Sequence, residues 1–457
     1  MFTGIKQAHF VGIGGIGMSA LAKWMIHEGI HVTGSDVHMS EITKDLSSRG
    51  AQIFSGHAVS NLSQQTDIVI HTPAVPDDNV ELVEARGRGV RTTTNFELLG
   101  EISGSYSTIV VTGTNGKSTT TAMLGLILEE AGYDPTVLVG SLVPGFKDGN
   151  LRVGKGRFFV IEGCEYKANM MHLKPEMIVL TNIEEDHLDF YRDLKHIQET
   201  FQKFVDKLKG QGMVVHNVRD KGSFPLKFPQ GIGYGTDVVT DYFSRDRETK
   251  PGSQSASVFR KEDKEVHLGD LDLQLPGSFN IENALAATAA AMELGVPFNT
   301  CRRALAEFGG IWRRFERVGV WHGADVVSDY AHHPSGVSGT IEATREFFPG
   351  RRIVLCYQPH QHDRTTKLFD DFVQTLSLAD HIILTEIYDV AGRNEDHDIS
   401  SKDLVEAIQK RDTAKDVRYA SDLDAAMGEL RKLVKAGDVI LIMGAGDVDD
   451  IARQIIV

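Results

Sequence analysis

One stretch of the chain joins an apolar strand to a glycine-rich turn and the start of a helix: Thr108-Ile109-Val110-Val111-Thr112-Gly113-Thr114-Asn115-Gly116-Lys117-Ser118. The unpaired backbone N–H groups and the dipole of such a helix start favour a bound phosphate. Lys117 adds positive charge for the outer phosphates, and the Ser118 hydroxyl can bind Mg²⁺. Val111 stands where the common P-loop has its first glycine. The stretch therefore predicts a variant nucleotide loop rather than an ordinary exposed turn.

The composition is typical of a globular protein of about three domains, because the chain has 457 residues, 41% hydrophobic and 24% charged. The net charge of -15 argues against nucleic-acid or acidic-membrane binding. Three cysteines form no CxxC pair, which suits a reducing cytoplasm. No apolar run is long enough to span a bilayer, so we expect no membrane partner.

A second glycine-rich turn, Gly12–Gly17, lies between a predicted strand over 8–11 and a predicted helix over 18–25. It has the GxGxxG pattern in a strand–turn–helix context, which is typical of dinucleotide-binding domains. The next strand, 30–34, is followed by Asp36, where an acid usually meets a ribose hydroxyl. Because the turn recognises a pyrophosphate, these residues leave NAD and another nucleotide diphosphate about equally open.

Two predicted strands after the phosphate loop end in acidic residues. The strand over 157–161 is followed by Glu162, and the strand over 177–182 precedes Asp186 and His187. If both strands run parallel to the loop's strand, these side chains lie on the loop's side of the sheet and can hold Mg²⁺ beside phosphates. The alternative for Asp186 and His187 is a helix N-cap and a surface histidine.

Residues 241–264 are polar and predict an exposed β-excursion, and an alanine-rich helix is predicted from Ala284. Asn280 and Asn283 are three residues apart, so they share a face at the start of this helix. Two amides there could hydrogen-bond the edge of a base. The alternative is that they serve as helix caps.

The last third repeats the alternation of strand and helix. Residues 309–316 predict a charged linker on which Arg313 and Arg314 could either reach a phosphate of a neighbouring domain or be solvated. Histidine pairs follow two of the strands, but no further ligand has a zinc-like spacing, so we expect no zinc site. The predicted strands and helices are 326–330, 352–356, 381–384 and 439–443, and 335–347, 365–378, 401–411 and 422–436.

The sequence thus predicts an α/β protein of three domains: a Rossmann-like domain over 1–104, a central P-loop-type mononucleotide-binding domain over 105–312, and a Rossmann-like C-terminal domain over 313–457.

The motifs occur in the order typical of the Mur ligases, and the chain resembles that family of ATP-dependent, amide-forming enzymes of peptidoglycan precursor synthesis. Together they are specific and cover the chain from residue 8 to about 450. The matching pieces are His9 to Met18, Gly113 to Thr121, Thr181 to Asp189, Arg313-Arg314-Phe315, and Asp329-Tyr330-Ala331-His332-His333-Pro334.

The resemblance implies a UDP-sugar rather than NAD in the N-terminal domain. The residues implied to bind it are Gly14, Gly15, Ile16, Gly17, Asp36, Thr72, Pro73 and Ala74. Those implied to bind ATP are Thr114, Asn115, Gly116, Lys117, Ser118, Thr119, Asn280, Asn283, Arg314 and Asp329. The resemblance assigns catalysis to Lys117, His187 and Arg314, metal binding to Ser118, Glu162 and His187, and the amino-acid side to His333, His360 and Arg364.

Within the family the motifs are most similar to the members that join L-alanine to the lactyl carboxylate of UDP-N-acetylmuramate. The resemblance implies ATP and Mg²⁺ as cofactors, an acyl-phosphate intermediate, UDP-N-acetylmuramate and L-alanine as partners, a cytoplasmic location, and a monomer or homodimer. A ligase for a recycled tripeptide and a non-catalytic UDP-sugar and ATP sensor are the alternatives.

Several positions depart from the family pattern. Asn115 and Phe279 each stand where a histidine is usual, which leaves ATP use intact. Gln361, His362 and Asp363, together with the segment 391–395, differ near the amino-acid site, so L-alanine, glycine and L-serine all stay open as the amino acid.

Overall fold

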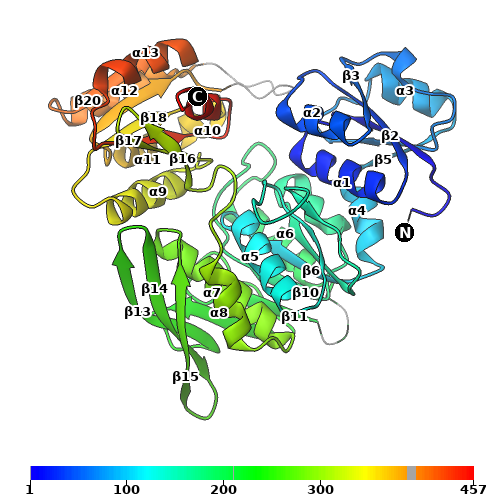
Figure 1. Ribbon diagram of the computed structural model, residues 1–457, viewed down its shortest axis with the longest axis horizontal. Helices are drawn as coiled ribbons and strands as arrows, with labels where there is room; N and C mark the ends of the chain where they lie inside the picture. Colours follow the sequence, from blue (N-terminus) through cyan, green and yellow to red (C-terminus); the bar gives the residue numbers. More distant parts are fainter. Residues whose placement is uncertain (1, 209, 211, 389–397, 457) are drawn as a thin grey trace. The chain divides into compact units, whose positions relative to one another are not determined.

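The structure is a computed structural model that describes residues 2–208, 210, 212–388 and 398–456 (Figure 1). Three sheets form three α/β domains, which confirms the predicted fold class. The described residues pack as two compact units: one contains the chain up to Tyr234 and Ala286–Ala304, the other Gly235–Leu285 and the chain from Leu305 onward. None of the described helices is long and apolar enough to cross a membrane. The domain boundaries at 104 and 312 stay predictions.

The first sheet has five parallel strands in the order β3-β2-β1-β4-β5. Helices follow each of its strands in the chain except β3, after which a short 3-10 turn, Val59–Asn61, takes their place. The strands are β1 (Gln7–Val11), β2 (His31–Asp36), β3 (Gln52–Ser55), β4 (Ile68–His71) and β5 (Arg91–Thr94), and the helices are α1 (Ile16–His27), α2 (Glu41–Ser48), α3 (Val80–Gly87) and α4 (Asn95–Ser103). The sequence did not predict β5, because its residues Arg91-Thr92-Thr93-Thr94 lack an apolar run.

The second sheet of the first unit has the order β12-β11-β10-β6-β9-β7-β8, and all its neighbours are parallel except β7 and β8. Its strands are β6 (Ser107–Thr112), β7 (Thr136–Leu138), β8 (Leu151–Arg152), β9 (Phe158–Gly163), β10 (Met177–Leu180), β11 (Met213–Asn217) and β12 (Gly231–Thr236). Its other elements are α5 (Lys117–Glu130), the 3-10 segment Tyr166–His172 and α6 (Leu194–Val205). In the register, Thr112 pairs with both Gly163 and Leu180, so the segments that follow these three residues leave the sheet side by side.

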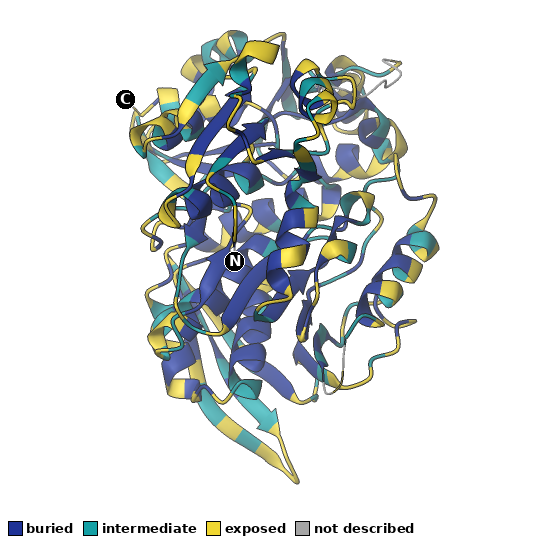
Figure 2. Ribbon diagram, turned by 90° about the vertical axis from the view of Figure 1, so that its right-hand side faces the viewer, coloured by how far each residue is buried: buried dark blue, intermediate teal, exposed yellow. Residues whose placement is uncertain are grey.

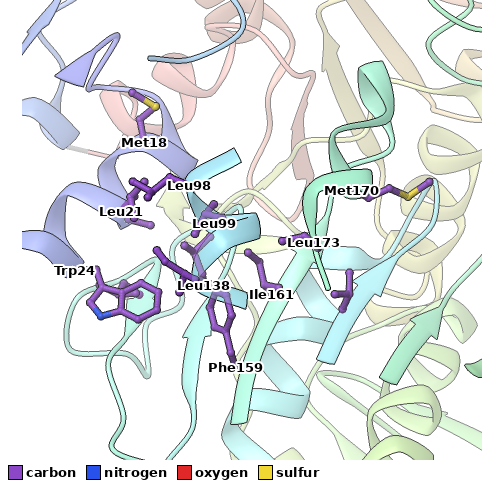
Figure 3. Packing of buried hydrophobic residues seen from close by; sticks show 14 of the residues in the cluster. Met18, Leu21, Trp24, Leu98, Leu99, Leu138, Phe159, Ile161, Met170 and Leu173 are labelled. Atoms are coloured by element: carbon purple, nitrogen blue, oxygen red, sulfur yellow. The ribbon is translucent and has the colours of Figure 1, made fainter. Parts of the chain in front are cut away.

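The first two domains share a hydrophobic core, part of which is drawn in Figure 3. Trp24 of α1 lies against Phe159 of β9, with ring centroids 5.5 Å apart. A polar contact adds to it: the Asn150 side-chain amide donates to the Ile16 carbonyl oxygen at 2.6 Å, and Lys23 Nζ donates to Asn150 Oδ1 at 3.1 Å. Asn150 thus holds the start of α1, which directly follows the first glycine-rich turn, and Trp24 and Lys23 hold its second half.

The second unit begins with three consecutive antiparallel strands, β13 (Tyr242–Lys250), β14 (Ser253–Lys261) and β15 (Glu265–Leu273). This confirms the β-excursion predicted over 241–264 and extends it to Leu273. The far end of these strands, at the bottom of Figure 2, is exposed, as their polar composition predicts.

Helix α7 (Ser278–Glu293) begins six residues before the predicted start at Ala284. The reason is the turn at Gly277, whose φ of 85° suits glycine and lets Asn280 N–H donate to its carbonyl oxygen at 3.0 Å. Asn280 and Asn283 therefore lie within the first two turns of α7. Helix α8 (Phe298–Ala306) follows.

The third sheet has the order β16-β17-β21-β18-β19-β20, in which only β16 is antiparallel to its neighbour. Its strands are β16 (Glu316–Trp321), β17 (Ala324–Asp329), β18 (Ile353–Tyr357), β19 (His381–Thr385), β20 (Asp416–Ala420) and β21 (Val439–Met443). Its helices are α9 (Pro334–Phe347), α10 (His362–Lys367), α11 (Phe369–Leu376), α12 (Ser401–Arg411), α13 (Leu423–Leu433) and α14 (Asp449–Gln454). The single helix predicted over 365–378 was wrong, because Leu368 leaves the helical region and divides α10 from α11.

Candidate active site

The phosphate loop leaves β6 through Gly113 and enters α5 through Gly116. Both glycines have positive φ, 136° and 83°, which side chains other than glycine rarely adopt. Gly116 is the N-cap residue of α5, so Lys117 and Ser118 are its first two residues and Thr119 lies in its first turn. The predicted strand–turn–helix is confirmed, and the N–H groups of the first turn of α5 lie at the carboxyl edge of the sheet.

The segment after β10 holds this loop from the side. Thr114 N–H donates to the Asn182 carbonyl oxygen at 2.9 Å, and Asn115 N–H donates to Asn182 Oδ1 at 2.9 Å. In return, the Thr181 hydroxyl donates to the Asn115 carbonyl oxygen at 2.6 Å. The segment that follows β10 of the same sheet thus holds the loop in its shape.

Lys117 lies across the loop that precedes it. Its ammonium donates to the carbonyl oxygens of Gly113 at 2.6 Å and Thr114 at 3.0 Å, and to Glu165 Oε1 at 2.9 Å. Burial opposes its charged form, but the Glu165 carboxylate outweighs burial and raises the pKa of Lys117. Burial likewise favours neutral Glu165, yet the Lys117 ammonium holds the pKa of that carboxyl below its usual value. The pair is therefore charged at neutral pH.

Glu165 was not among the predicted site residues. It is 4% exposed, its Oε1 also lies 3.7 Å from His187 Nε2, and its Oε2 has no hydrogen-bond partner among the residues that the structure describes. The sequence held one signal, since Glu165 follows the same strand as Glu162, three residues later. The tertiary structure was needed to place Lys117 and His187 on it.

The predicted metal residues divide between two groups. The Ser118 hydroxyl donates to Glu162 Oε2 at 3.0 Å, and Glu162 Oε1 also accepts from the Gly140 N–H. His187 belongs to the other group. Its Nε2 lies 3.7 Å from Glu165 Oε1 and 3.8 Å from Asp186 Oδ2. Among the described residues, no group of three or more histidine, cysteine, aspartate or glutamate side chains is arranged to hold a metal ion. A hydroxyl beside a carboxylate nevertheless suits Mg²⁺, which takes few protein ligands and completes its shell with phosphates and water.

The first glycine-rich turn gathers most of the residues predicted to bind a UDP-sugar. Gly14 N–H donates to Asp36 Oδ2 at 2.8 Å, and Gly15, Ile16 and Gly17 form the start of α1. A methyl group added at Gly12 would lie 2.7 Å from the Thr72 methyl, so the turn packs closely against the loop after β4. Pro73 and Ala74 continue that loop, and Ala74 N–H donates to the Thr72 hydroxyl at 3.4 Å.

In the second unit, Asn280 and Asn283 lie on one face of α7, as the spacing predicts. Asn283 Nδ2 donates to Asn280 Oδ1 at 3.2 Å, and Asn280 Nδ2 donates to the Pro276 carbonyl oxygen at 2.7 Å. Both side chains are buried. Their orientation is therefore fixed by the turn that starts the helix.

The two linker arginines differ in surroundings. Arg313 is buried, its guanidinium donates to the Gly446 carbonyl oxygen at 2.9 Å, and burial lowers its pKa. Arg314 is less buried and its guanidinium lies 4.9 Å from the centre of the Tyr330 ring. Arg313 therefore has a structural position, and Arg314 is the one that suits the predicted phosphate contact.

Asp329, predicted near the ATP ribose, ends β17. Its two oxygens accept the backbone N–H groups of Phe315 at 2.7 Å and Ala331 at 2.8 Å. Burial raises the pKa of Asp329, against the lowering effect of Arg314 and these hydrogen bonds. The carboxyl group thus ties the linker to the turn that carries the histidines.

The predicted amino-acid residues gather at the carboxyl ends of β17 and β18. His333 is the N-cap residue of α9, and the His360 ring stacks on Tyr388 with centroids 5.7 Å apart. Arg364 Nη1 lies 3.4 Å from His360 Nδ1. Gln361 has a positive φ of 74° and precedes α10. The segment 391–395, which departs from the family pattern, lies outside the described residues.

Three family models match the chain in succession: "Mur ligase family, catalytic domain" over residues 7–107, "Mur ligase middle domain" over 111–291, and "Mur ligase, glutamate ligase domain" over 313–446. A UDP-N-acetylmuramate–L-alanine ligase from Geobacter sp. (strain M21) is 39% identical over 453 residues, covering 98% of this chain and 96% of that protein. The chain belongs to the Mur ligase family. A protein of the same name from Caldanaerobacter subterraneus is 38% identical, and the match covers 98% of this chain and 97% of that protein.

Solved Mur ligases agree with this assignment. The UDP-N-acetylmuramate–alanine ligase of Thermotoga maritima has a TM-score of 0.84 and 30% identity, with 98% of each chain covered. The murein peptide ligase of Psychrobacter arcticus has a TM-score of 0.74 and 25% identity, with 99% of this chain and 98% of that chain covered. The predicted family is confirmed, and the family uses ATP.

Proposed function

We propose that this Mur ligase joins L-alanine to the lactyl carboxylate of UDP-N-acetylmuramate at the expense of ATP, in peptidoglycan precursor synthesis. The observation that carries the proposal is the Lys117–Glu165 pair on the phosphate loop, beside the Ser118–Glu162 contact. It places a fixed positive charge and a metal-binding pair at one helix start. The 39% identity to a UDP-N-acetylmuramate–L-alanine ligase over 98% of the chain supports this choice of substrates.

The reaction has two steps. The lactyl carboxylate oxygen attacks the γ-phosphorus of ATP, so that ADP leaves and an acyl phosphate forms. The amine of L-alanine then attacks the acyl carbon, phosphate leaves, and the amine loses a proton. Activation is needed because an unactivated carboxylate would have to expel oxide, which is a very poor leaving group.

The chain's residues act mainly by positioning and charge. Lys117 and Arg314 neutralise the phosphoryl group during transfer, and the glycine-rich turn with Asp36 and Thr72 binds the UDP-sugar. Asn280 and Asn283 hydrogen-bond the base, and Asp329 lies near the ribose. His333, His360 and Arg364 face the amino acid.

Magnesium is part of the proposal. The residues that would hold it come from two groups, Ser118 with Glu162 and, in the other group, His187, and bound Mg²⁺ would supply charge stabilisation to the transferring phosphoryl group. The Ser118 hydroxyl and the Glu162 carboxylate provide oxygen donors, which this cation prefers. The proposed location is the cytoplasm, and a monomer or homodimer stays a prediction.

A tripeptide ligase is the second candidate, because the murein peptide ligase fold covers nearly the whole chain. Phosphate release should be measured with ATP, Mg²⁺ and UDP-N-acetylmuramate, with L-alanine, L-serine, glycine or L-alanyl-γ-D-glutamyl-meso-diaminopimelate added separately. Release that is fastest with L-alanine is expected. Faster release with another amino acid or with the tripeptide would change the substrate, and no release with any of them would leave only the sensor.

A further inference from the structure

Helix α9 of the C-terminal domain lies against β13, the first of the three antiparallel strands, and one ion pair joins them (Figure 1). Arg247 Nη1 donates to Glu346 Oε1 at 3.1 Å, and Nη2 donates to Glu346 Oε2. Two parallel N–H···O bonds of this kind fix the angle between the two side chains as well as their distance. The pair therefore contributes to the position of α9 on β13.

The remaining donor of the Arg247 guanidinium, Nε, contacts the buried side chain of Gln254. Arg247 Nε donates to Gln254 Oε1 at 2.7 Å, and Gln254 is 2% exposed. Gln254 Nε2 donates to the carbonyl oxygens of Leu275 at 2.5 Å and Gly277 at 2.9 Å. The orientation of the Gln254 side-chain amide is therefore determined, because its oxygen accepts from a donor and its nitrogen donates to two acceptors.

These carbonyl groups flank Pro276, whose own carbonyl oxygen accepts from Asn280 Nδ2. Gly277 accepts the N–H of Asn280, and Asn280 accepts the amide of Asn283. An unbroken series of hydrogen bonds thus runs from Glu346 on α9 through Arg247 and Gln254 to the asparagine pair on α7.

A second contact joins the same two helices. A methyl group added at Gly339 of α9 would lie 3.6 Å from the Phe279 ring, and one added at Gly277 would lie 2.4 Å from it. The Phe279 ring therefore covers the turn at Gly277 and reaches α9. Phe279 stands beside Asn280, so this packing acts on the same turn as Gln254.

We propose that Arg247 and Gln254 are positioning residues that fix the base-binding amides of Asn280 and Asn283 while α9 is docked, and so couple nucleotide binding to the C-terminal domain. The inference rests on the proposed function in one respect, which is that Asn280 and Asn283 hydrogen-bond the base of the nucleotide. By reciprocity, a nucleotide that needs the fixed amides also favours the docked position of α9. Neither Arg247 nor Gln254 touches the reacting atoms.

The test compares ADP affinity, measured by calorimetry, in the full chain and in Arg247→Gln, Glu346→Gln and the double variant. Arg245→Gln is a matched control, because Arg245 lies on the same strand as Arg247 and makes an equivalent two-bond pair, but with Glu265 of β15 and not with α9. We expect each single variant to bind ADP about tenfold more weakly, the double variant to be no weaker than the Arg247 variant, and the control to match the wild type.

A second readout separates positioning from general stability. We expect KM for ATP to rise in the Arg247 variant while KM for UDP-N-acetylmuramate stays unchanged. If the Arg247 variant binds ADP as tightly as the wild type, even with a lower melting temperature, the proposed coupling is wrong but the proposed function is unaffected. A wild-type chain that bound no ADP would overturn both the coupling and the proposed function.

Discussion

The two glycine-rich loops share one plan, strand–turn–helix at the carboxyl edge of a parallel sheet, but they differ in what surrounds them. Asp36 receives one N–H of the first loop, and the loop after β4 packs against it. The second loop is held through several hydrogen bonds by the strand end at 181–184, and its lysine is charged. In the proposed function the first loop only binds the UDP-sugar, while the second also takes part in phosphoryl transfer.

Two buried carboxylates show the same difference. Glu81, in the first domain, accepts from Asn61 at 2.6 Å and Ala58 N–H at 3.1 Å with one oxygen, and from Ser35 at 2.5 Å with the other. Glu165 has one oxygen on Lys117 and one without a hydrogen-bond partner in the described part of the chain. A fully satisfied carboxylate stabilises a fold, whereas a partly satisfied one beside a cation marks a site of function.

The largest expected effect is at Lys117. Lys117→Ala should lower the rate of phosphate release by about 10³-fold, because one charged donor at a transferring group contributes roughly 4 kcal/mol. The circular dichroism spectrum should stay that of the wild type. Turnover close to wild type would remove the distinction between the two loops.

Gly113→Ala and Gly14→Ala compare the loops directly. The methyl group at 113 would lie 2.2 Å from Thr181 Oγ1, at a φ that alanine rarely adopts, so ATP binding should be lost and stability reduced by about 3 kcal/mol. At 14 it would meet the end of the Asp36 side chain at 2.9 Å, which can shift. We expect KM for UDP-N-acetylmuramate to rise about tenfold there, with KM for ATP unchanged. Equal losses for ATP in both variants would contradict the comparison.

Glu165→Gln removes the charge that faces Lys117. The expected loss in kcat is about tenfold to 100-fold, because the lysine would keep its two carbonyl partners but lose its ionic one. Steady-state kinetics checks it, and thermal unfolding should show a loss of stability as well, because the buried Lys117 ammonium loses its ionic partner. An unchanged kcat together with a large fall in melting temperature would make Glu165 a structural residue like Glu81.

Glu81→Gln should leave turnover nearly unchanged and reduce stability instead. Burial favours its neutral form, but hydrogen bonds from His9, Ser35 and Asn61 outweigh burial and lower its pKa from 4.5 to about 2. The charged carboxylate then contributes about 3 kcal/mol above pH 4.5, and this stability is lost as the pH falls toward 2.

Urea unfolding of wild type and Glu81→Gln across this pH range tests the prediction. The difference in unfolding free energy should be largest at neutral pH and shrink below pH 4.5. A difference that does not vary with pH would show that the carboxylate charge is not the cause.

Local sequence patterns predicted the elements with strong apolar runs. The strands around Val110, Val179 and Ile440 are buried over all or nearly all of their length, so each contains a continuous apolar run. The polar strand β5 was missed, and the start of α7 was placed six residues late. Both depend on packing and on a glycine turn, which a periodicity of apolar residues does not report.

The sequence by itself determined the three-domain α/β fold, the two glycine-rich loops and the residues of their motifs, because these depend on local periodicity and on residue chemistry. Only the tertiary structure brought Glu165 to Lys117, Arg247 to Glu346 and Gln254 to the turn before Asn280. Each contact joins residues from different elements, and its geometry is set by the register of strands and the packing of helices. The spacing of residues along the chain predicts neither the register of the strands nor the packing of the helices.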